Sequence, residues 1–275
     1  MSVIFNNFVS QLIYFIGIIF IAGFLISILN RIFYTIVGGS RTVCYATGFL
    51  GTPIHELAHA VMCIVFLHRI EEIKLFQIDN QTGVLGYVNH SYNRKNIYQN
   101  MGNYFIGIAP IIAGGFVIFF AMQQLIPGVH SEFAAYVSDL AFLQADGFTV
   151  DWFAYATVVF KGMFLELFYG IGEGLVWWVF ILIALCISLH MNLSGADIKG
   201  ALPAIPLLMA VLFVINLILG FVFGGMYGAF TEAMSIAGAY LSGMLVIALV
   251  LSVLSVLLAL IVRIAFGLLG KLIHR

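Results

Sequence analysis

Charged residues are scarce in this sequence. Of its 275 residues only 8% are charged, while 63% are hydrophobic. A water-soluble domain usually carries about 25% charged residues, which cover its surface. The shortage of charge therefore excludes an ordinary soluble enzyme and a disordered protein. It indicates a multi-pass membrane protein, with the lipid bilayer as its main partner.

An excess of positive charge is also missing, because 11 basic and 12 acidic residues give a net charge of −1. Proteins that bind nucleic acids need a basic face for the phosphate backbone, so no nucleic-acid partner is expected. Cysteine is rare as well. The 3 cysteines form no CxxC pair and lie in apolar sequence, which predicts free thiols rather than disulfides.

Six apolar runs are candidate membrane spans, since a helix needs roughly 20 apolar residues to cross the bilayer. These runs are Phe8–Leu29, Thr42–Leu67, Met101–Ile126, Leu175–Leu189 with a continuation toward Lys199, Ala204–Phe223 and Ala237–Ala265. The last run is longer than the bilayer requires, so it is expected to tilt or to project. The predicted fold is a single all-α membrane domain over residues 1–275, with about six transmembrane helices.

Two linkers interrupt the apolar runs. The first, residues 68–100, is the most polar stretch, and within it Ile70–Phe76 and Val84–His90 flank an Asn-Gln-Thr-Gly sequence typical of a turn. This pattern predicts a short β-hairpin between the second and third spans. The second linker, residues 127–174, is acidic and aromatic, and its segment Trp152–Gly172 is expected to lie at the membrane interface.

Positive charge is unevenly distributed between the linkers, and this bias predicts an orientation. With six spans, both termini share one side of the membrane with the first linker, and that side carries most of the Lys and Arg residues. Cytoplasmic loops are rich in Lys and Arg, so both termini are expected in the cytoplasm, at the plasma membrane of a prokaryote. The second run allows an alternative, because Thr52 and Pro53 resemble a helix N-terminus that would leave re-entrant backbone before it.

The second run contains an HExxH motif, His55-Glu56-Leu57-Ala58-His59. Residues four apart share one face of a helix, so both imidazoles can bind one Zn²⁺ ion. Glu56 lies beside these ligands and can act as the general base toward a water molecule. Ionisable groups inside an apolar run are costly, and a bound cation would offset that cost. The alternative is a polar cluster of a proton relay or a transporter.

A third ligand is expected from an acidic or histidine side chain at the same depth in the membrane. The end of the fourth run offers His190, Ser194 and Asp197, which share one helical face if that helix continues. Asp197 is the favoured ligand. His190 is the alternative ligand, or else a residue that supports the ligands.

A hydrophobic chain with HExxH in an early span and an Asp in a later span resembles the site-2 protease class of intramembrane zinc metalloproteases. The resemblance implies that His55, His59 and Asp197 bind the zinc ion. The motif glutamate of that family activates water, a role that falls to Glu56 in this sequence. The resemblance also implies that the hairpin after the motif helix presents unwound substrate by strand addition.

The sequence therefore predicts an intramembrane zinc endopeptidase that hydrolyses peptide bonds of membrane-embedded or membrane-proximal substrates. A membrane-spanning helix satisfies its own backbone hydrogen bonds, so a substrate must unwind before it can be cut. Two alternatives stay open. One is a membrane-embedded zinc peptidase that cleaves short peptides, and the other is a non-enzymatic transporter or sensor that binds a metal ion at the same residues.

Overall fold

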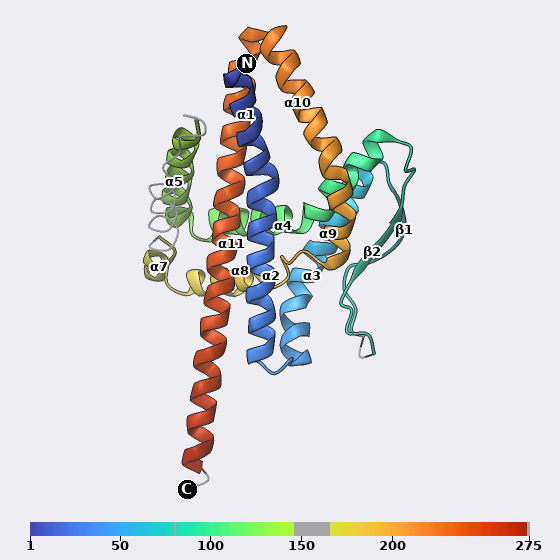
Figure 1. Cartoon of the computed structure of the whole chain (residues 1–275). Coiled ribbons are helices and arrows are strands. Elements are labelled where there is room, and N and C mark those ends of the chain that lie inside the picture. The colour runs from blue at the N-terminus through green and yellow to red at the C-terminus, as the bar shows by residue number, and fades with distance from the viewer. Residues whose placement is uncertain (80, 146–165, 274–275) are drawn as a thin grey trace.

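The computed structural model describes residues 1–79, 81–145 and 166–273, and this part of the chain is mostly helical. The helical elements are α1 (Ser2–Leu12), η1 (Ile13–Gly17), α2 (Ile18–Ile36), α3 (Arg41–Val65), α4 (Ile97–Leu125), α5 (Pro127–Ala145), α7 (Glu166–Tyr169), η4 (Gly170–Glu173), α8 (Leu175–Ser188), α9 (Gly195–Ala201), η5 (Leu202–Ala204), α10 (Ile205–Phe221) and α11 (Gly224–Ile273). The strands are β1 (Arg69–Lys74) and β2 (Tyr87–Ser91). The prediction of a helical protein with a small antiparallel sheet is therefore confirmed (Figure 1).

Five helical segments among the described residues are long and apolar enough to cross a membrane, which agrees with a membrane protein. They are Ser2–Ile36, Arg41–Val65, Ile97–Leu125, Gly195–Phe221 and Gly224–Leu268. The fourth predicted run forms a helix that is shorter than the hydrocarbon core of a bilayer is thick. With 14 residues, α8 is about 21 Å long at 1.5 Å per residue, against a hydrocarbon core of about 30 Å. The chain leaves the helix after Ser188 and enters α9 only at Gly195, so the predicted continuation toward Lys199 is wrong.

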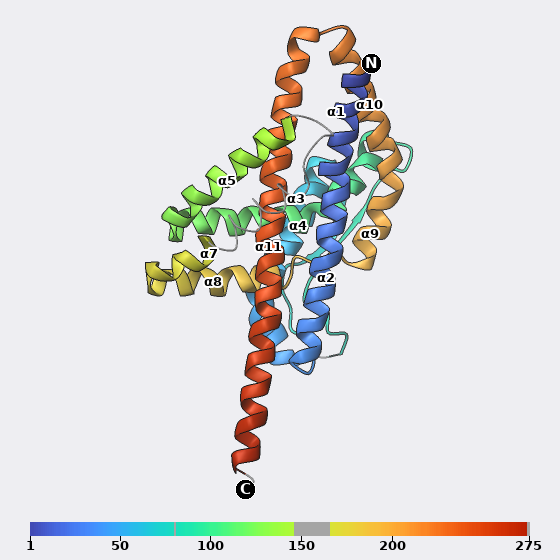
Figure 2. The ribbon, with the colours of Figure 1, turned by 60° about the vertical axis from the view of Figure 1, so that its left-hand side comes forward.

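The first helical segment is continuous from Ser2 to Ile36, because a π-helical turn, η1, joins α1 to α2 without a break. α2 packs along α11, the 50-residue helix at the end of the described chain. Both views show α2 and α11 running in the same direction, with the N-terminus at one end and the C-terminus at the other (Figures 1 and 2). Parallel helices that both cross a bilayer start on one side and end on the other. This arrangement does not support the prediction of both termini in the cytoplasm.

Two helices, α4 and α8, lie crosswise to α11 in both views (Figures 1 and 2), and each contacts both α3 and α11. Helix length alone therefore does not give the number of membrane crossings. α5 packs against α4 and α11 and buries Val129, Phe133 and Val137 in the core, so the predicted linker over residues 127–174 begins as a packed helix. The predicted interfacial segment Trp152–Gly172 falls largely outside the described residues.

The motif helix α3 begins well before the motif. Ser40 is its N-cap, and the Ser40 hydroxyl accepts a hydrogen bond from the N–H of Val43 (3.4 Å). Gly38 and Gly39, both at positive φ, end α2 and turn the chain into this cap. Pro53 lies inside the helix rather than at its start, so the alternative with re-entrant backbone before Pro53 is wrong.

The sheet pairs β1 with β2 in antiparallel register, with Arg69 opposite Ser91 and Lys74 opposite Tyr87. Regular pairing stops at Lys74 and Tyr87, so both strands are shorter at the turn than predicted and a longer loop joins them. The sheet follows α3 directly in the chain and contacts it with both strands. This contact brings the hairpin to the motif helix.

Candidate metal centre

Three side chains with metal-binding atoms converge where α3 meets α9. His55 and His59 stand one helical turn apart on α3, and their Nε2 atoms are 3.2 Å apart. The Oδ1 atom of Asp197, on α9, lies 3.4 Å from the Nε2 atom of His59. All three ligand atoms lie within 4.8 Å of one another. The fold thus brings the HExxH pair together with the favoured third ligand.

These distances fit a zinc ion. Zn²⁺ binds nitrogen and oxygen ligands at about 2.0–2.2 Å in a tetrahedron, which separates neighbouring ligand atoms by about 3.3 Å. The Nδ1 atom of His55 lies 2.7 Å from the backbone oxygen of His190, and that of His59 lies 2.8 Å from the backbone oxygen of Ile106. A carbonyl oxygen only accepts, so in the neutral imidazoles each Nδ1 carries the proton and each Nε2 keeps a lone pair for a metal. Two lone pairs that face each other repel, and a cation between them removes that repulsion.

The oxygen of Ile106 is free to accept because of a proline one turn further along α4. In an α-helix, the carbonyl of residue i accepts from the N–H of residue i+4, but Pro110 has no N–H to donate. The Ile106 oxygen accepts from His59 instead. Beside it, a Cβ at Gly107 would lie 2.7 Å from the backbone oxygen of Asp197, so glycine lets α9 approach α4 closely.

A buried amide on α2 binds the backbone just before His190. The Asn30 side chain donates hydrogen bonds to the backbone oxygens of Ser188 and Leu189, each at 3.1 Å, and is only 3% exposed. The Ser188 oxygen also accepts from the backbone N–H of Met191 (3.2 Å), so Asn30 reinforces the turn that ends α8. Asn30 was not predicted as a site residue, because it directly follows the first apolar run. One feature of the sequence could have pointed to Asn30: it is a polar residue next to an apolar run. A polar side chain in a membrane is costly unless it has a structural or functional partner.

Asp197 is held by the start of α9. Its backbone N–H donates to the hydroxyl of Ser194 (3.1 Å), and its Oδ2 accepts from the backbone N–H of Ser194 (2.7 Å). This reciprocal pair is a capping box, and it leaves Oδ1 facing His59. The predicted helical face shared by His190, Ser194 and Asp197 is wrong, because residues 189–194 form the connection between α8 and α9.

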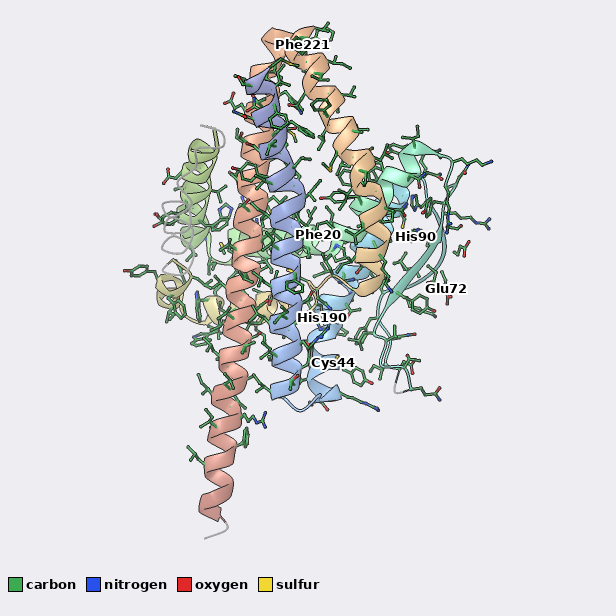
Figure 3. All side chains as sticks on the ribbon, viewed as in Figure 1. Phe20, Cys44, Glu72, His90, His190 and Phe221 are labelled. Carbon is green, nitrogen blue, oxygen red and sulfur yellow. The ribbon has the colours of Figure 1, made fainter. Side chains whose placement is uncertain are left out.

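His190, labelled in Figure 3, faces hydroxyl groups of α2 and α3. Its Nε2 atom lies 3.1 Å from the hydroxyl of Thr47 and 3.3 Å from that of Tyr34, and its Nδ1 atom lies 3.4 Å from that of Thr52. These contacts engage both ring nitrogens. Among the described residues, the group that could hold a metal ion at the motif consists of His55, His59 and Asp197, and His190 contacts His55 through its backbone oxygen.

Glu56 lies next to the ligands on α3 and is 7% exposed. It lines a cavity of about 470 Å³ under residues 86–89 of the hairpin and a second cavity of about 580 Å³ beside residues 83–86. At Gly86 the hairpin comes so close that a Cβ would lie 2.8 Å from the Cγ atom of Glu56. A backbone segment therefore passes over the candidate general base, and the cavities leave room for water and a peptide beside it.

The donor set as a whole selects a class of metal. Two imidazoles and one carboxylate suit Zn²⁺ and other divalent transition metals, whereas Mg²⁺ and Ca²⁺ prefer oxygen ligands alone. The described geometry brings together three candidate ligands and one neighbouring carboxylic acid, Glu56. Comparison with known protein families, with curated proteins and with solved structures finds no match to this chain.

Proposed function

We propose that this chain is an intramembrane zinc endopeptidase, similar in mechanism to the site-2 protease class that its sequence resembles. The observation that carries the proposal is the convergence of two Nε2 atoms and one carboxylate oxygen, at separations of 3.2 and 3.4 Å. That spacing suits a tetrahedral Zn²⁺ ion. Glu56, a carboxylate outside this group, lies beside it.

The chain's own groups divide the work of hydrolysis. His55, His59 and Asp197 would hold the ion, which when bound polarises a scissile carbonyl and lowers the pKa of a water molecule. Glu56 would accept a proton from that water and deliver it to the leaving amine. The two backbone oxygens behind the histidines keep both imidazoles from rotating, so the ligands are preorganised.

The hairpin supports an extended peptide as substrate. β2 pairs with β1 along one edge, and its residues 87–89 line the cavity that holds the motif. An extended peptide that adds to the other edge of β2 would place its backbone beside Glu56. A transmembrane helix must unwind before it can pair in this way. We therefore expect substrates with helix-weakening Gly, Pro or Asn residues near the cut.

The bilayer is the proposed setting of the reaction. The motif lies on α3, which is long and apolar enough to span a membrane. Large apolar side chains also point away from the protein on several helices, for example Phe24, Leu182 and Ile261. In water such surface would be costly, whereas lipid tails would cover it.

Replacement of the general base tests the proposal. Purified protein in lipid vesicles is offered a transmembrane substrate and a short peptide with the same cleavage sequence. We expect wild-type protein to cut the transmembrane substrate. We expect Glu56→Gln to bind zinc as wild-type protein does but to lose about 10²–10⁴-fold in turnover, the usual contribution of a general base.

Each other outcome favours an alternative. Cleavage of the short peptide alone indicates a membrane-embedded peptidase for short substrates. Stoichiometric zinc without cleavage of either substrate indicates a transporter or a sensor. Full turnover in Glu56→Gln removes the general-base role of Glu56.

A further inference from the structure

A second group of metal-binding side chains lies at the C-terminal end of the motif helix. Cys63, in the last turn of α3, is fully buried, and His68, just after the helix, is 5% exposed. His90 comes from β2 and is labelled on the hairpin side of the molecule in Figure 3. The ligand atoms of these three residues lie within 4.8 Å of one another. None of them belongs to the HExxH group.

The two imidazoles present the nitrogens that a metal requires. Their Nδ1 atoms are 3.0 Å apart, and the Nε2 atom of His68 lies 2.8 Å from the backbone oxygen of Gln99. That oxygen only accepts, so Nε2 of His68 carries the proton and Nδ1 keeps a lone pair toward His90. Histidine binds a metal through an unprotonated ring nitrogen, and the Nδ1 of His68 keeps such a lone pair.

The backbone takes a strained conformation to place His68 over Cys63. Among the described residues outside glycine, Leu67 alone has a positive φ, of 58°. The N–H of His68 donates to the oxygen of Cys63 (2.8 Å), and the N–H of Leu67 donates to that of Ile64 (3.1 Å). This pattern is a Schellman motif, whose left-handed position is normally glycine. Strain of this kind persists where the surrounding structure requires it, often at functional sites.

We propose that Cys63, His68 and His90 form a second zinc site, which fastens the hairpin to the motif helix. One thiolate and two imidazoles are ligands that Zn²⁺ accepts in a tetrahedral site, with water in the fourth position. The same donors discriminate against Mg²⁺ and Ca²⁺. Binding releases the thiol proton of Cys63 to solvent.

The site would stabilise the position of the strand that covers the motif. His90 is the fourth residue of β2, and residues 87–90 of this strand, His90 included, line the cavity that contains His55 and Glu56. A metal held between α3 and His90 ties that strand to the end of the helix that carries the motif. The proposal concerns metal binding alone and does not depend on peptidase activity.

Metal content and cobalt spectroscopy test this site on the full chain in detergent. We expect wild-type protein to bind about two zinc ions per chain and the double variant His55→Ala/His59→Ala to keep about one. Protein loaded with Co²⁺ instead should show the near-ultraviolet charge-transfer absorption of a thiolate–cobalt bond. We expect that absorption in wild-type protein and in the double variant, and its loss in Cys63→Ser.

Cys44 provides the matched control, since it lies in the first turn of the same helix and belongs to no metal-binding group within the described residues. Cys44→Ser should keep the absorption. His90→Ala, at a half-buried position of β2, should weaken cobalt binding at the thiolate by about 10-fold or more. Absence of the band from cobalt-loaded wild-type protein overturns the proposal, and so does a band that persists in Cys63→Ser.

Discussion

The two motif histidines depend on backbone oxygens that their own helix does not supply. The Ile106 oxygen can orient His59 because Pro110 withholds the N–H that would otherwise bond to it. Loss of a group that orients a metal-binding histidine typically costs about 10–100-fold in metal affinity. A proline that is itself no ligand should therefore influence zinc binding.

We expect Pro110→Ala to weaken zinc binding by up to about tenfold. Alanine restores an N–H that donates to the Ile106 oxygen, so His59 must share its acceptor. Zinc titration against a chelator of known affinity measures the change. Pro206→Ala is the control, because Pro206 lies at the start of α10, where a missing N–H costs the helix nothing. Equal affinities in both variants would show that Pro110 does not act on His59.

Asp197 has two roles that substitution can separate. Its Oδ1 faces His59, while its Oδ2 completes the capping box with Ser194. We expect Asp197→Asn to lower zinc affinity by at least about 100-fold, more than the loss of a supporting partner would. Ser194→Ala should cost about 1 kcal/mol of stability and leave zinc bound. Zinc content and thermal unfolding distinguish the two effects, and full zinc occupancy in Asp197→Asn would remove Asp197 from the ligand set.

The sequence predicted which side chains converge better than it predicted how they are positioned. The HExxH spacing is local and predicts two imidazoles on one helix face. Depth in the membrane favours Asp197 as a ligand, and a helix cap at Asp197 is the alternative that its sequence allows. The structure shows both features, because Asp197 forms a capping box with Ser194 and faces His59. The oxygens of Ile106 and His190 could not be predicted, because every residue carries a backbone oxygen and only the fold decides which one faces a histidine.

At the scale of elements, a pair of buried amides joins α1 to α10. Gln11 Nε2 donates to Asn216 Oδ1 (3.3 Å), and Asn216 Nδ2 donates to Gln11 Oε1 (2.7 Å). Gln11 is 4% exposed and Asn216 is fully buried. Helices in lipid gain little from apolar contact with one another, so polar pairs of this kind hold them together.

We expect Asn216→Leu to lower the free energy of unfolding by about 1–2 kcal/mol, since it leaves the amide of Gln11 buried without its partner. The double variant Gln11→Leu/Asn216→Leu should lose less than the sum of the single variants. Denaturant unfolding in detergent measures the free energies of the single and double variants. Asn6→Leu is the control, because Asn6 is exposed and lies on α1 together with Gln11. Additive single effects would mean that the two amides do not support each other.

The apolar runs predicted where helices occur, because length and apolar content are local properties. They did not predict how the helices lie. The crosswise position of α4 depends on glycines that admit distant segments: Gly107 faces the backbone of Asp197, and Gly114 faces Met191. Such contacts join residues far apart in the sequence, so no single run reveals them.

At the scale of the whole molecule, the long helices α2 and α11 run between two opposite ends, one with the N-terminus and one with the C-terminus (Figure 1). With 50 residues, α11 is about 75 Å long at 1.5 Å per residue, so it extends beyond a hydrocarbon core of about 30 Å. Near its C-terminal end, Arg263 donates to the backbone oxygen of Ile36 (3.4 Å), which places the end of α2 beside it. Arg31 and Arg41 lie at this same end. At the other end, residues 1–12 and the turn into α11 contain no Lys or Arg.

This asymmetry predicts that the C-terminus lies in the cytoplasm and the N-terminus on the opposite side, because cytoplasmic ends are rich in Lys and Arg. A chain with a different epitope tag at each terminus tests the prediction in intact spheroplasts. An added protease should remove the N-terminal tag at once and the C-terminal tag only after permeabilisation. Equal protection of both tags would restore the six-span orientation, and α1–α2 and α11 could not then both cross the bilayer in the parallel arrangement of Figure 1.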